Sequence, residues 1–180
     1  MQAKTVSSTL TVMTEIMQPN DANFLGKVFG GRLLASIDLC AYTTAARFSG
    51  EVCVTASFDQ VDFHEPIEVG EVVTMTGHIT YVGRTSLEVT IEVEAENILE
   101  GTRRHTNTAR VTMVAVRDGK PVEVPRLVCE TRDDKLRFLQ GRYRKESRGN
   151  LNKARAAAYA TFELASDAEL DEMLKKERLS

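Results

Sequence analysis

The feature that most constrains the fold is one long segment of helical apolar spacing, followed by several long segments that alternate in polarity. In Gly30–Phe48, apolar side chains recur at positions 33, 34, 37, 41, 45 and 48, and Gly50 supplies a stop. The alternating segments, which predict strands, are Val52–His64, Glu71–Val82, Ser86–Asn97 and His105–Val116. The short connections at Gly83–Thr85 and Leu99–Arg104 are typical of antiparallel hairpins. The sequence therefore predicts an α+β fold, in which a curved antiparallel sheet packs around one apolar helix.

Less regular patterns predict the remaining elements of this region. Ser8–Met17 mixes alternation with β-branched residues and is predicted to be a strand, whereas Gln18–Gly26 is rich in turn formers and is predicted to be a loop. In Val52–His64, apolar residues at 52, 54, 56 and 58 share one side, and the phase slips near Asp59–Val61. Such a slip is typical of a bulge or bend. The alternation in Ser86–Asn97 is regular, which predicts one solvated face.

The sequence changes character at Pro121–Pro125. We expect a domain of residues 1–125 and a helical C-terminal extension of residues 126–180. Residues 1–125 hold 10 Lys and Arg against 16 Asp and Glu, a charge of 10 − 16 = −6, whereas residues 126–180 hold 13 against 10, a charge of +3.

The extension has helical composition and spacing. Apolar residues at 136, 139 and 143 have helical spacing, and Ala154–Phe162 and Leu164–Leu174 are rich in helix formers. The basic stretch Arg132–Arg155 is predicted to be solvated helix surface, and docking of phosphate or of a partner is the alternative. We expect the extension to pack against a neighbouring subunit.

Composition narrows the class of protein. A net charge of −3 and a pI near 5.7 argue against general binding of nucleic acids or anionic membranes. No apolar run approaches the roughly 18 residues that a membrane span requires, and the first residues lack the apolar core of a signal peptide. Cys40, Cys53 and Cys129 are an odd number without CxxC spacing, which predicts reduced thiols in a cytoplasmic protein.

Several established catalytic motifs are absent from the sequence. It contains no GxSxG, HExxH or GxGxxG string and no cluster of cysteine and histidine with metal-ligand spacing. The segment Gly26–Leu33 resembles a phosphate loop, but Arg32–Leu33 replaces the Lys–Ser/Thr pair that would hold phosphate and magnesium. We therefore expect no metal and no cofactor, and chemistry carried by carboxylates, amides and backbone dipoles.

The most informative residues are Gly30, Gly31 and Asp38. The two glycines open a helix whose first amides have no acceptor within the helix, and a ligand can approach them closely. Such amides suit a carbonyl or oxyanion. Asp38 follows two turns later between apolar neighbours, where a carboxylate is costly unless it is paired or used. The alternatives are a tight entry turn for the glycines, and a boundary position facing solvent or an arginine for Asp38.

At this point the chain resembles a known family, the hotdog-fold acyl-CoA thioesterases, in the branch that includes the brain acyl-CoA hydrolase and the YciA-type bacterial enzymes. The resemblance spans roughly residues 10–125. The motifs that carry it lie in Asn23–Asp38, Thr55–Gly70 and Gly83–Ser86. The family's fold, a curved antiparallel sheet around one long helix, agrees with the pattern described above.

The resemblance implies a hydrolase that converts fatty acyl-CoA to free fatty acid and coenzyme A. Asp38 would activate water as a general base or attack the thioester directly. The amide of Gly31 or Gly30 would bind the thioester carbonyl. Asn23 would reach water or carbonyl from the facing subunit, which makes the homodimer the active unit. An Asx turn within its own loop is the alternative for Asn23.

The resemblance also implies the binding subsites and the assembly. Gly83, Arg84, Thr85 and Ser86 would contact coenzyme A, with a plain turn as the alternative. Leu33, Leu34 and Ile37 would line an acyl pocket, although core packing is their default role. Coenzyme A would enter only as part of substrate and product. The family suggests a trimer of dimers, a hexamer.

Two other functions stay open at this stage. The Phe63–Pro66 segment contains His64 and Glu65, a pair that a hotdog dehydratase or hydratase would use. A non-catalytic acyl-CoA-binding regulator is the third reading, although the only basic stretch lacks a helix-turn-helix pattern. Asp59 and Asp62 are predicted to be structural residues at the strand bend rather than catalytic ones.

Overall fold

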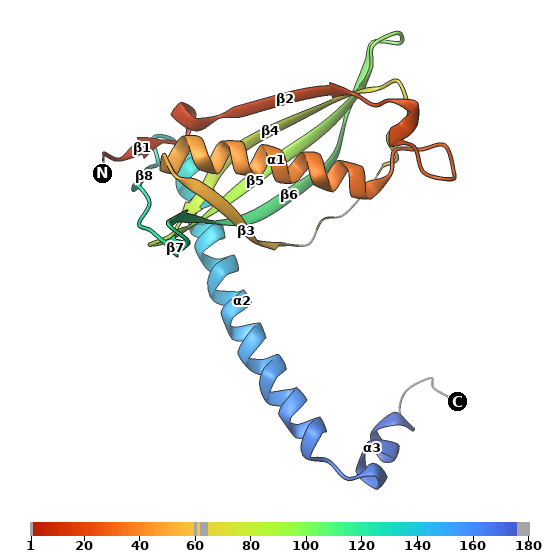
Figure 1. Cartoon of the computed structure of the whole chain (residues 1–180), viewed down its shortest axis with the longest axis vertical. Coiled ribbons are helices and arrows are strands. Elements are labelled where there is room, and N and C mark those ends of the chain that lie inside the picture. The colour runs from red at the N-terminus through yellow and green to blue at the C-terminus, as the bar shows by residue number, and fades with distance from the viewer. Residues whose placement is uncertain (1, 60, 62–64, 176–180) are drawn as a thin grey trace. The chain divides into compact units, whose positions relative to one another are not determined.

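The computed structural model describes residues 2–59, 61 and 65–175. The chain divides into two compact units, residues 1–141 and residues 142–180. In the first unit a curved sheet wraps around one helix (Figure 1). All the motifs that carry the family resemblance lie in this first unit.

The central helix α1 spans Gly30–Ser49, one residue more than the sequence predicted. It ends where Gly50 adopts a left-handed φ of 75° and donates its N–H to the carbonyl oxygen of Ala46 over 2.8 Å. Its buried apolar residues are Leu33, Ile37, Cys40, Ala41, Ala45 and Phe48. Leu34 is partly buried and packs against the core. The helical spacing of the sequence therefore selected the buried side of α1.

The strands of the main sheet are β2 (Thr11–Ile16), β3 (Val52–Phe58), β4 (Val72–Val82), β5 (Ser86–Asn97), β6 (Thr102–Arg117) and β7 (Lys120–Pro121). Their order is β2-β4-β5-β6-β3, with β7 paired to β6, and neighbouring strands are antiparallel. Both predicted hairpins are present. The sheet curls around α1 (Figure 1), which confirms the predicted fold class.

The helix lies close to the sheet because β4 has a glycine under it. A Cβ at Gly77 would lie 2.5 Å from Oγ1 of Thr44 and 3.0 Å from Sγ of Cys40, both on α1. The surrounding core contains fully buried Ile37 and Phe48 from the helix and Met75 from β4. Close packing of this kind fixes the height of α1 above the sheet, and with it the positions of the helix's functional residues.

The residues that share one face of strand β3 are not those that the sequence predicted. Its pairing with β6 shifts register between Thr55 and Ser57, earlier than the predicted slip at Asp59–Val61. Residues 60 and 62–64, at the end of the predicted strand, lie outside the described residues. Before the shift Val52 and Val54 point away from the helix and are 58% and 47% exposed. After the register shift, Phe58 pairs with buried Val111 and so lies on the opposite face of the strand from Val52 and Val54. A bulge exchanges the two faces of a strand in this way.

The N-terminal segment is also less regular than predicted. The predicted strand Ser8–Met17 begins only at Thr11, after a short 3-10 helix η1 (Ser7–Thr9). A two-residue strand β1 (Lys4–Thr5) pairs in parallel with β8 (Leu127–Val128). The predicted loop contains a second 3-10 turn, η2 (Pro19–Asp21).

Helix α2 (Arg132–Leu164) begins in the first unit, where residues 132–141 cover part of the outer face of the sheet. The rings of Phe138 and Tyr81 lie 5.0 Å apart between centroids. A Cβ at Gly141 would lie 2.6 Å from Cβ of Tyr81, so glycine allows this close contact. Arg137 hydrogen-bonds the buried ring of His78. Burial, and then the charge of Arg137, lower the pKa of His78, so this imidazole is held neutral.

The second unit contains the rest of α2 and a short helix α3 (Asp167–Leu174). The predicted helical segment Leu164–Leu174 is interrupted, because Ser166 caps a new helix. Its backbone N–H donates to Oε2 of Glu169 over 2.8 Å in a capping box. In the described part of the chain, no helix has the length and apolarity to cross a membrane.

Candidate active site

The loop that precedes α1 is built around Asn23. Its side-chain Oδ1 accepts hydrogen bonds from the backbone N–H groups of Leu25, over 2.8 Å, and Lys27, over 3.2 Å. The backbone N–H of Gly26 donates to the carbonyl oxygen of Asn23 over 3.0 Å. This is the Asx turn that the sequence left as an alternative. The side-chain Nδ2 has no hydrogen-bond acceptor among the described residues, so it is available as a donor.

The first amides of α1 are free, as predicted from the glycine pair. Phe29 occupies the N-cap position and provides no side-chain cap. The backbone N–H groups of Gly30 and Gly31 therefore have no acceptor within the described chain. A side chain at Gly31 would meet the exposed ring of Phe29 and would have to displace it beside these amides. Two N–H donors at the positive end of a 20-residue helix suit a carbonyl oxygen or an anion.

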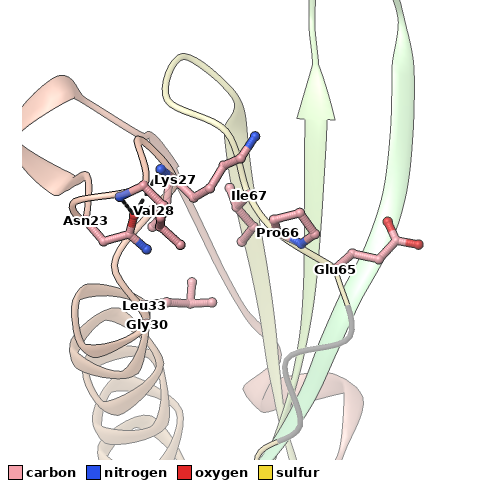
Figure 2. A pocket seen from close by; sticks show the side chains of 9 residues that line it. Asn23, Lys27, Val28, Gly30, Leu33, Glu65, Pro66 and Ile67 are labelled. Carbon is pink, nitrogen blue, oxygen red and sulfur yellow. Dashed lines mark hydrogen bonds between the residues drawn. The ribbon is translucent and has the colours of Figure 1, made fainter.

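A cavity of about 360 Å³ opens beside these groups (Figure 2). Its lining residues are Asn23, Leu25, Lys27, Val28, Gly30, Leu33, Glu65, Pro66 and Ile67. In Figure 2, Leu33 from the helix and Ile67 from the segment opposite flank the same space. Of the residues predicted to form an acyl pocket, only Leu33 lines this cavity, since Ile37 is fully buried in the core.

Arg32 ties the Asn23 loop to the helix and to strand β2. Its Nε donates to Oδ1 of Asp21 over 2.9 Å, and its Nη2 donates to Oε2 of Glu15 over 2.5 Å. It also contacts the hydroxyl of buried Ser36, which donates to Glu15. The side-chain hydrogen bond with Glu15 raises the pKa of Arg32. Asp21 is in turn bound to the start of the helix, because its carbonyl oxygen accepts a hydrogen bond from the N–H of Phe29 over 2.8 Å. The Arg32 guanidinium thus links η2, strand β2 and helix α1 at the N-terminus of the helix.

Asp38 is half-buried on α1 and is bound by a hydroxyl rather than by an arginine. The Oγ1 of Thr55 on β3 donates to Oδ1 of Asp38 over 2.6 Å. Thr55 also lies 3.4 Å from Sδ of Met113. Among the described residues, no cation pairs with Asp38. Its carboxylate therefore stays available to water or to a ligand, which is the arrangement that a general base or a nucleophile requires.

One chain does not bring these two groups of residues together. Asp38 lies seven residues after Gly31 in α1, which corresponds to about 10.5 Å along the helix axis. Asn23 and Gly30 lie at the Gly31 end of the helix and line the same cavity. The structure therefore separates a hydrogen-bond donor group, at the start of the helix, from the Asp38–Thr55 carboxylate pair.

The predicted coenzyme A segment is the tight turn between β4 and β5. The N–H of Gly83 donates to the carbonyl oxygen of Ser86 over 2.7 Å, and the carbonyl of Arg84 accepts from the N–H of Val124 over 3.0 Å. The Arg84 side chain is exposed and forms no ion pair with a described residue. Gly83 also lines a second cavity of about 290 Å³, which includes Phe138. The turn is therefore held by its backbone, with the Arg84 guanidinium available to solvent.

Two further predictions concern His64 and the absence of a metal site. His64, on which the dehydratase reading depends, lies outside the described residues, as does Asp62. The described part of the chain contains no group of three or more His, Cys, Asp and Glu side chains arranged to hold a metal ion. Thr55 and Arg32 are the residues that the sequence reasoning missed. A signal for Thr55 was its place at the start of the Thr55–Gly70 motif.

Comparisons with known proteins agree with this geometry. The model of the thioesterase superfamily matches residues 25–102. An acyl-CoA thioester hydrolase of Bacillus subtilis, YkhA, is 40% identical over 124 residues, which cover 68% of this chain and 72% of that protein. The chain belongs to the thioesterase superfamily. The family resemblance inferred from the motifs is therefore confirmed, as is the expectation of a thioester hydrolase.

Solved structures support this membership in the thioesterase superfamily. A hexameric acyl-CoA thioesterase, solved without ligand, is 40% identical with a TM-score of 0.80, covering 87% of this chain and 99% of that one. An acyl-CoA hydrolase from Staphylococcus aureus, solved with butyryl coenzyme A, coenzyme A and coenzyme A disulfide, is 29% identical with a TM-score of 0.78. That match covers 88% of this chain and 99% of the other. Further structures of this enzyme have alanine in place of an asparagine, an aspartate or a threonine.

Proposed function

We propose that this protein hydrolyses the thioester bond of fatty acyl-CoA, giving a free fatty acid and coenzyme A. The observation that carries the proposal is a carboxylate, Asp38, that is held by the hydroxyl of Thr55 and left without a cation. Membership in the thioesterase superfamily supplies the reaction class. The acyl-CoA hydrolases among the relatives supply the substrate class.

In the proposed reaction, water or Asp38 itself attacks the thioester carbonyl carbon. As a general base, Asp38 accepts a proton from the attacking water while the carbon–sulfur bond breaks and coenzyme A leaves as a thiolate that is then protonated. As a nucleophile, Asp38 forms an anhydride that water hydrolyses. In both routes Thr55 holds Oδ1 of Asp38, which leaves Oδ2 free to react.

The negative charge that develops on the thioester oxygen needs hydrogen-bond donors. The free amides of Gly30 and Gly31 supply two N–H groups at the positive end of a helix. The Nδ2 of Asn23 adds a third donor, because the Asx turn engages only the Oδ1 atom. The Asx turn therefore orients the donor, and the two roles considered for Asn23 are compatible.

We propose that each active site combines two subunits. Both the base and the oxyanion donors must lie within hydrogen-bond distance of one thioester, yet Gly31 and Asp38 of one chain lie about 10.5 Å apart along the helix. A two-fold partner supplies the missing half. Val52 and Val54 on β3 expose apolar surface, and no described strand pairs with the outer edge of β3. Such an edge favours association with a second copy.

The Staphylococcus aureus structures support the choice of residues. In that enzyme the replaced asparagine and aspartate are fifteen residues apart, and the aspartate and threonine are seventeen apart. Asn23, Asp38 and Thr55 have the same two spacings in this chain. The alignment of spacings supports these three residues as one functional set.

The remaining assignments complete the proposal. Arg84 offers an exposed guanidinium for a phosphate of coenzyme A, and the hydroxyl-bearing residues Thr85 and Ser86 adjoin it. A hexamer of three dimers is proposed from the hexameric relative. A cytoplasmic location is proposed from the three unpaired cysteines. The apolar cavity that includes Leu33 is the proposed entrance for the acyl chain.

The first experiment measures release of free thiol from acyl-CoAs of increasing chain length. Asp38→Asn keeps an acceptor for Thr55 but removes the base, so we expect a loss of about 10²-fold or more. Glu100→Gln, which neutralises an exposed carboxylate in the turn between β5 and β6, is the control and should keep the wild-type rate. Full activity of Asp38→Asn would refute the assignment. Hydration of an enoyl-CoA that depends on His64 would favour the dehydratase instead.

The second experiment tests the shared site by mixing two inactive variants. Asn23→Ala and Asp38→Asn are unfolded and refolded together, or co-expressed, so that mixed dimers form. If the site is shared, each mixed dimer contains one intact site with Asn23 from one subunit and Asp38 from the other. Activity should then reappear on mixing. If both residues served within one chain, mixing would restore nothing.

A further inference from the structure

The cavity of about 290 Å³ beside the turn between β4 and β5 has no role in the proposed reaction. It lies between Gly83 of the turn, the segment 124–127 and Phe138 of α2. Neither Asp38 nor Asn23 is among its lining residues. Its walls come from three stretches that are far apart in the sequence, so tertiary packing forms this cavity.

Contacts within the chain fix the walls of this cavity. The N–H of Val124 donates to the carbonyl oxygen of Arg84 over 3.0 Å, which ties the segment 124–127 to the turn. The ring of Phe138 packs against Tyr81, with the ring centroids 5.0 Å apart. The cavity is therefore formed before a ligand arrives, and binding there orders few additional side chains.

The lining of the cavity is apolar apart from one cation. Val82, Pro125 and Phe138 supply apolar walls, whereas Arg126 is exposed and forms no ion pair with a described residue. No carboxylate is among the described residues that line the cavity. Bases stack on aromatic side chains, and guanidinium groups bind phosphate oxygens. The lining is therefore suited to a planar base that carries a phosphate nearby.

Arg84 places a second unpaired guanidinium close to the same cavity. Arg126 stands two residues after Val124, whose N–H is bonded to Arg84. Two residues of extended chain span about 7 Å, so both arginine side chains can reach one small ligand. Two cations beside an apolar cavity match a ligand with one base and two separate phosphate groups.

We propose that this cavity binds the adenosine 3′-phosphate end of coenzyme A, an inference that rests on the proposed thioesterase function. Adenine enters the cavity beside Phe138, Arg126 binds the 3′-phosphate, and Arg84 binds the diphosphate. An acyl chain would occupy only the apolar part of the cavity and would leave both guanidinium groups without a partner.

The position of the cavity agrees with the length of this substrate. Thr55 holds Asp38 through its hydroxyl. Thr55 also pairs with Met113, which pairs in turn with Leu87, the residue that follows the turn. Two strand spacings, about 10 Å, therefore separate Thr55 from the end of the turn. The extended pantetheine arm of coenzyme A is longer than this, so a thioester at Asp38 can place its diphosphate at Arg84.

Titration calorimetry of the full-length protein with coenzyme A and with 3′-dephospho-coenzyme A tests this assignment. Arg126→Met should raise the Kd of coenzyme A about tenfold, the scale of a hydrogen bond to a charged group. It should change the Kd of dephospho-coenzyme A by less than about twofold, because that ligand lacks the phosphate that Arg126 is proposed to bind. Arg84→Met should weaken binding of both ligands alike, because both carry the diphosphate.

Two further variants test the base and the specificity of the charge effect. Phe138→Leu keeps an apolar side chain against Tyr81 but removes the aromatic face, so both ligands should bind about fivefold or more weakly. Arg103→Met is the matched control. Arg103 pairs with Glu96, which lies about 34 Å along β5 from Ser86, so this variant should bind both ligands as the wild type does. Circular dichroism checks that each variant is folded.

Equal weakening of the two ligands in Arg126→Met, or an unchanged Kd of coenzyme A in that folded variant, would overturn the assignment. The same weakening in Arg103→Met would also overturn it, because the effect would then be one of net charge. Thiol release tests the proposed function separately. A preference for coenzyme A that depends on Arg126, without thiol release, would keep the binding site and refute the hydrolase. Thiol release without this preference would keep the hydrolase and refute the binding site.

Discussion

Replacing Arg32 with methionine would remove the cation that joins the Asn23 loop, strand β2 and the central helix. The side chains of Arg32, Glu15 and Asp21 are 34%, 28% and 12% exposed. Breaking a buried ion pair from one side costs roughly 3–5 kcal/mol, because a charge is left without a partner. Partial exposure and surviving contacts reduce this cost. Glu15 keeps the hydroxyl of Ser36, and Asp21 keeps the N–H of Gln18 at 2.8 Å.

The expected loss for Arg32→Met is therefore about 1.5–3 kcal/mol in the free energy of unfolding. Urea denaturation measures it, and for a chain of this length the midpoint of thermal unfolding should fall by about 3–12 °C. Catalysis should also suffer, because Arg32 fixes Asp21, which accepts the N–H of Phe29 next to the proposed oxyanion amides. Misplacement of these groups should lower kcat/KM by about 10- to 100-fold.

Arg103→Met is the matched control, because Arg103 forms an ion pair of the same 2.5 Å length with Glu94, at an exposed position on β6. Exposed pairs contribute about 0.2–1 kcal/mol, and this one links β6 to β5 rather than to the Asn23 loop or α1. The reasoning would be refuted if both variants lost the same small amount of stability, or if Arg32→Met retained the wild-type kcat/KM.

Further predictions concern the core, the helix start and pH. Gly77→Ala should cost about 1–3 kcal/mol of unfolding free energy, because its Cβ would lie 2.5 Å from Oγ1 of buried Thr44; urea denaturation measures the loss, and an unchanged midpoint would contradict this packing. Gly31→Ala should alter stability little, because the ring it displaces is exposed, yet lower kcat tenfold or more; proportional losses in stability and kcat would contradict the oxyanion role. Arg104 hydrogen-bonds Glu71 and holds the pKa of that carboxyl below its ordinary 4.5. The stabilisation is therefore complete above about pH 4.5 and is lost as pH falls through the lower, folded-state pKa. Glu71→Gln should be less stable than wild type at about pH 7, and its stability should approach that of wild type at about pH 3. Urea denaturation at both pH values checks this, and a difference in midpoint between variant and wild type that does not depend on pH would argue against the Arg104–Glu71 pair.

Local residue patterns were sufficient to predict most of the helices and strands of the fold. The apolar spacing in α1 and the alternation in β5 reflect residues that face one dominant core, so the period of the sequence matches the period of the backbone. Patterns were less informative at β3. The apolar residues on the outer face of this edge strand are not buried within one chain, so their alternation does not report the face that packs against the core. The break at Ser166 was missed because helix formers flank it on both sides and only the capping box marks it.

By itself, the sequence determined which residues we propose to carry the chemistry: a glycine pair, an aspartate two turns later and an asparagine in the loop before them. These positions were readable because free amides and a carboxylate in an apolar helix are unusual, and each requires a reason. Only the tertiary structure decided that Thr55 from a distant strand holds Asp38, and that Asn23 uses one side-chain atom for its turn and leaves the other free. Only the structure decided, too, that the donors and the carboxylate stand apart in one chain. Hydrogen bonds between elements depend on distances in space, and spacing along the chain does not encode them.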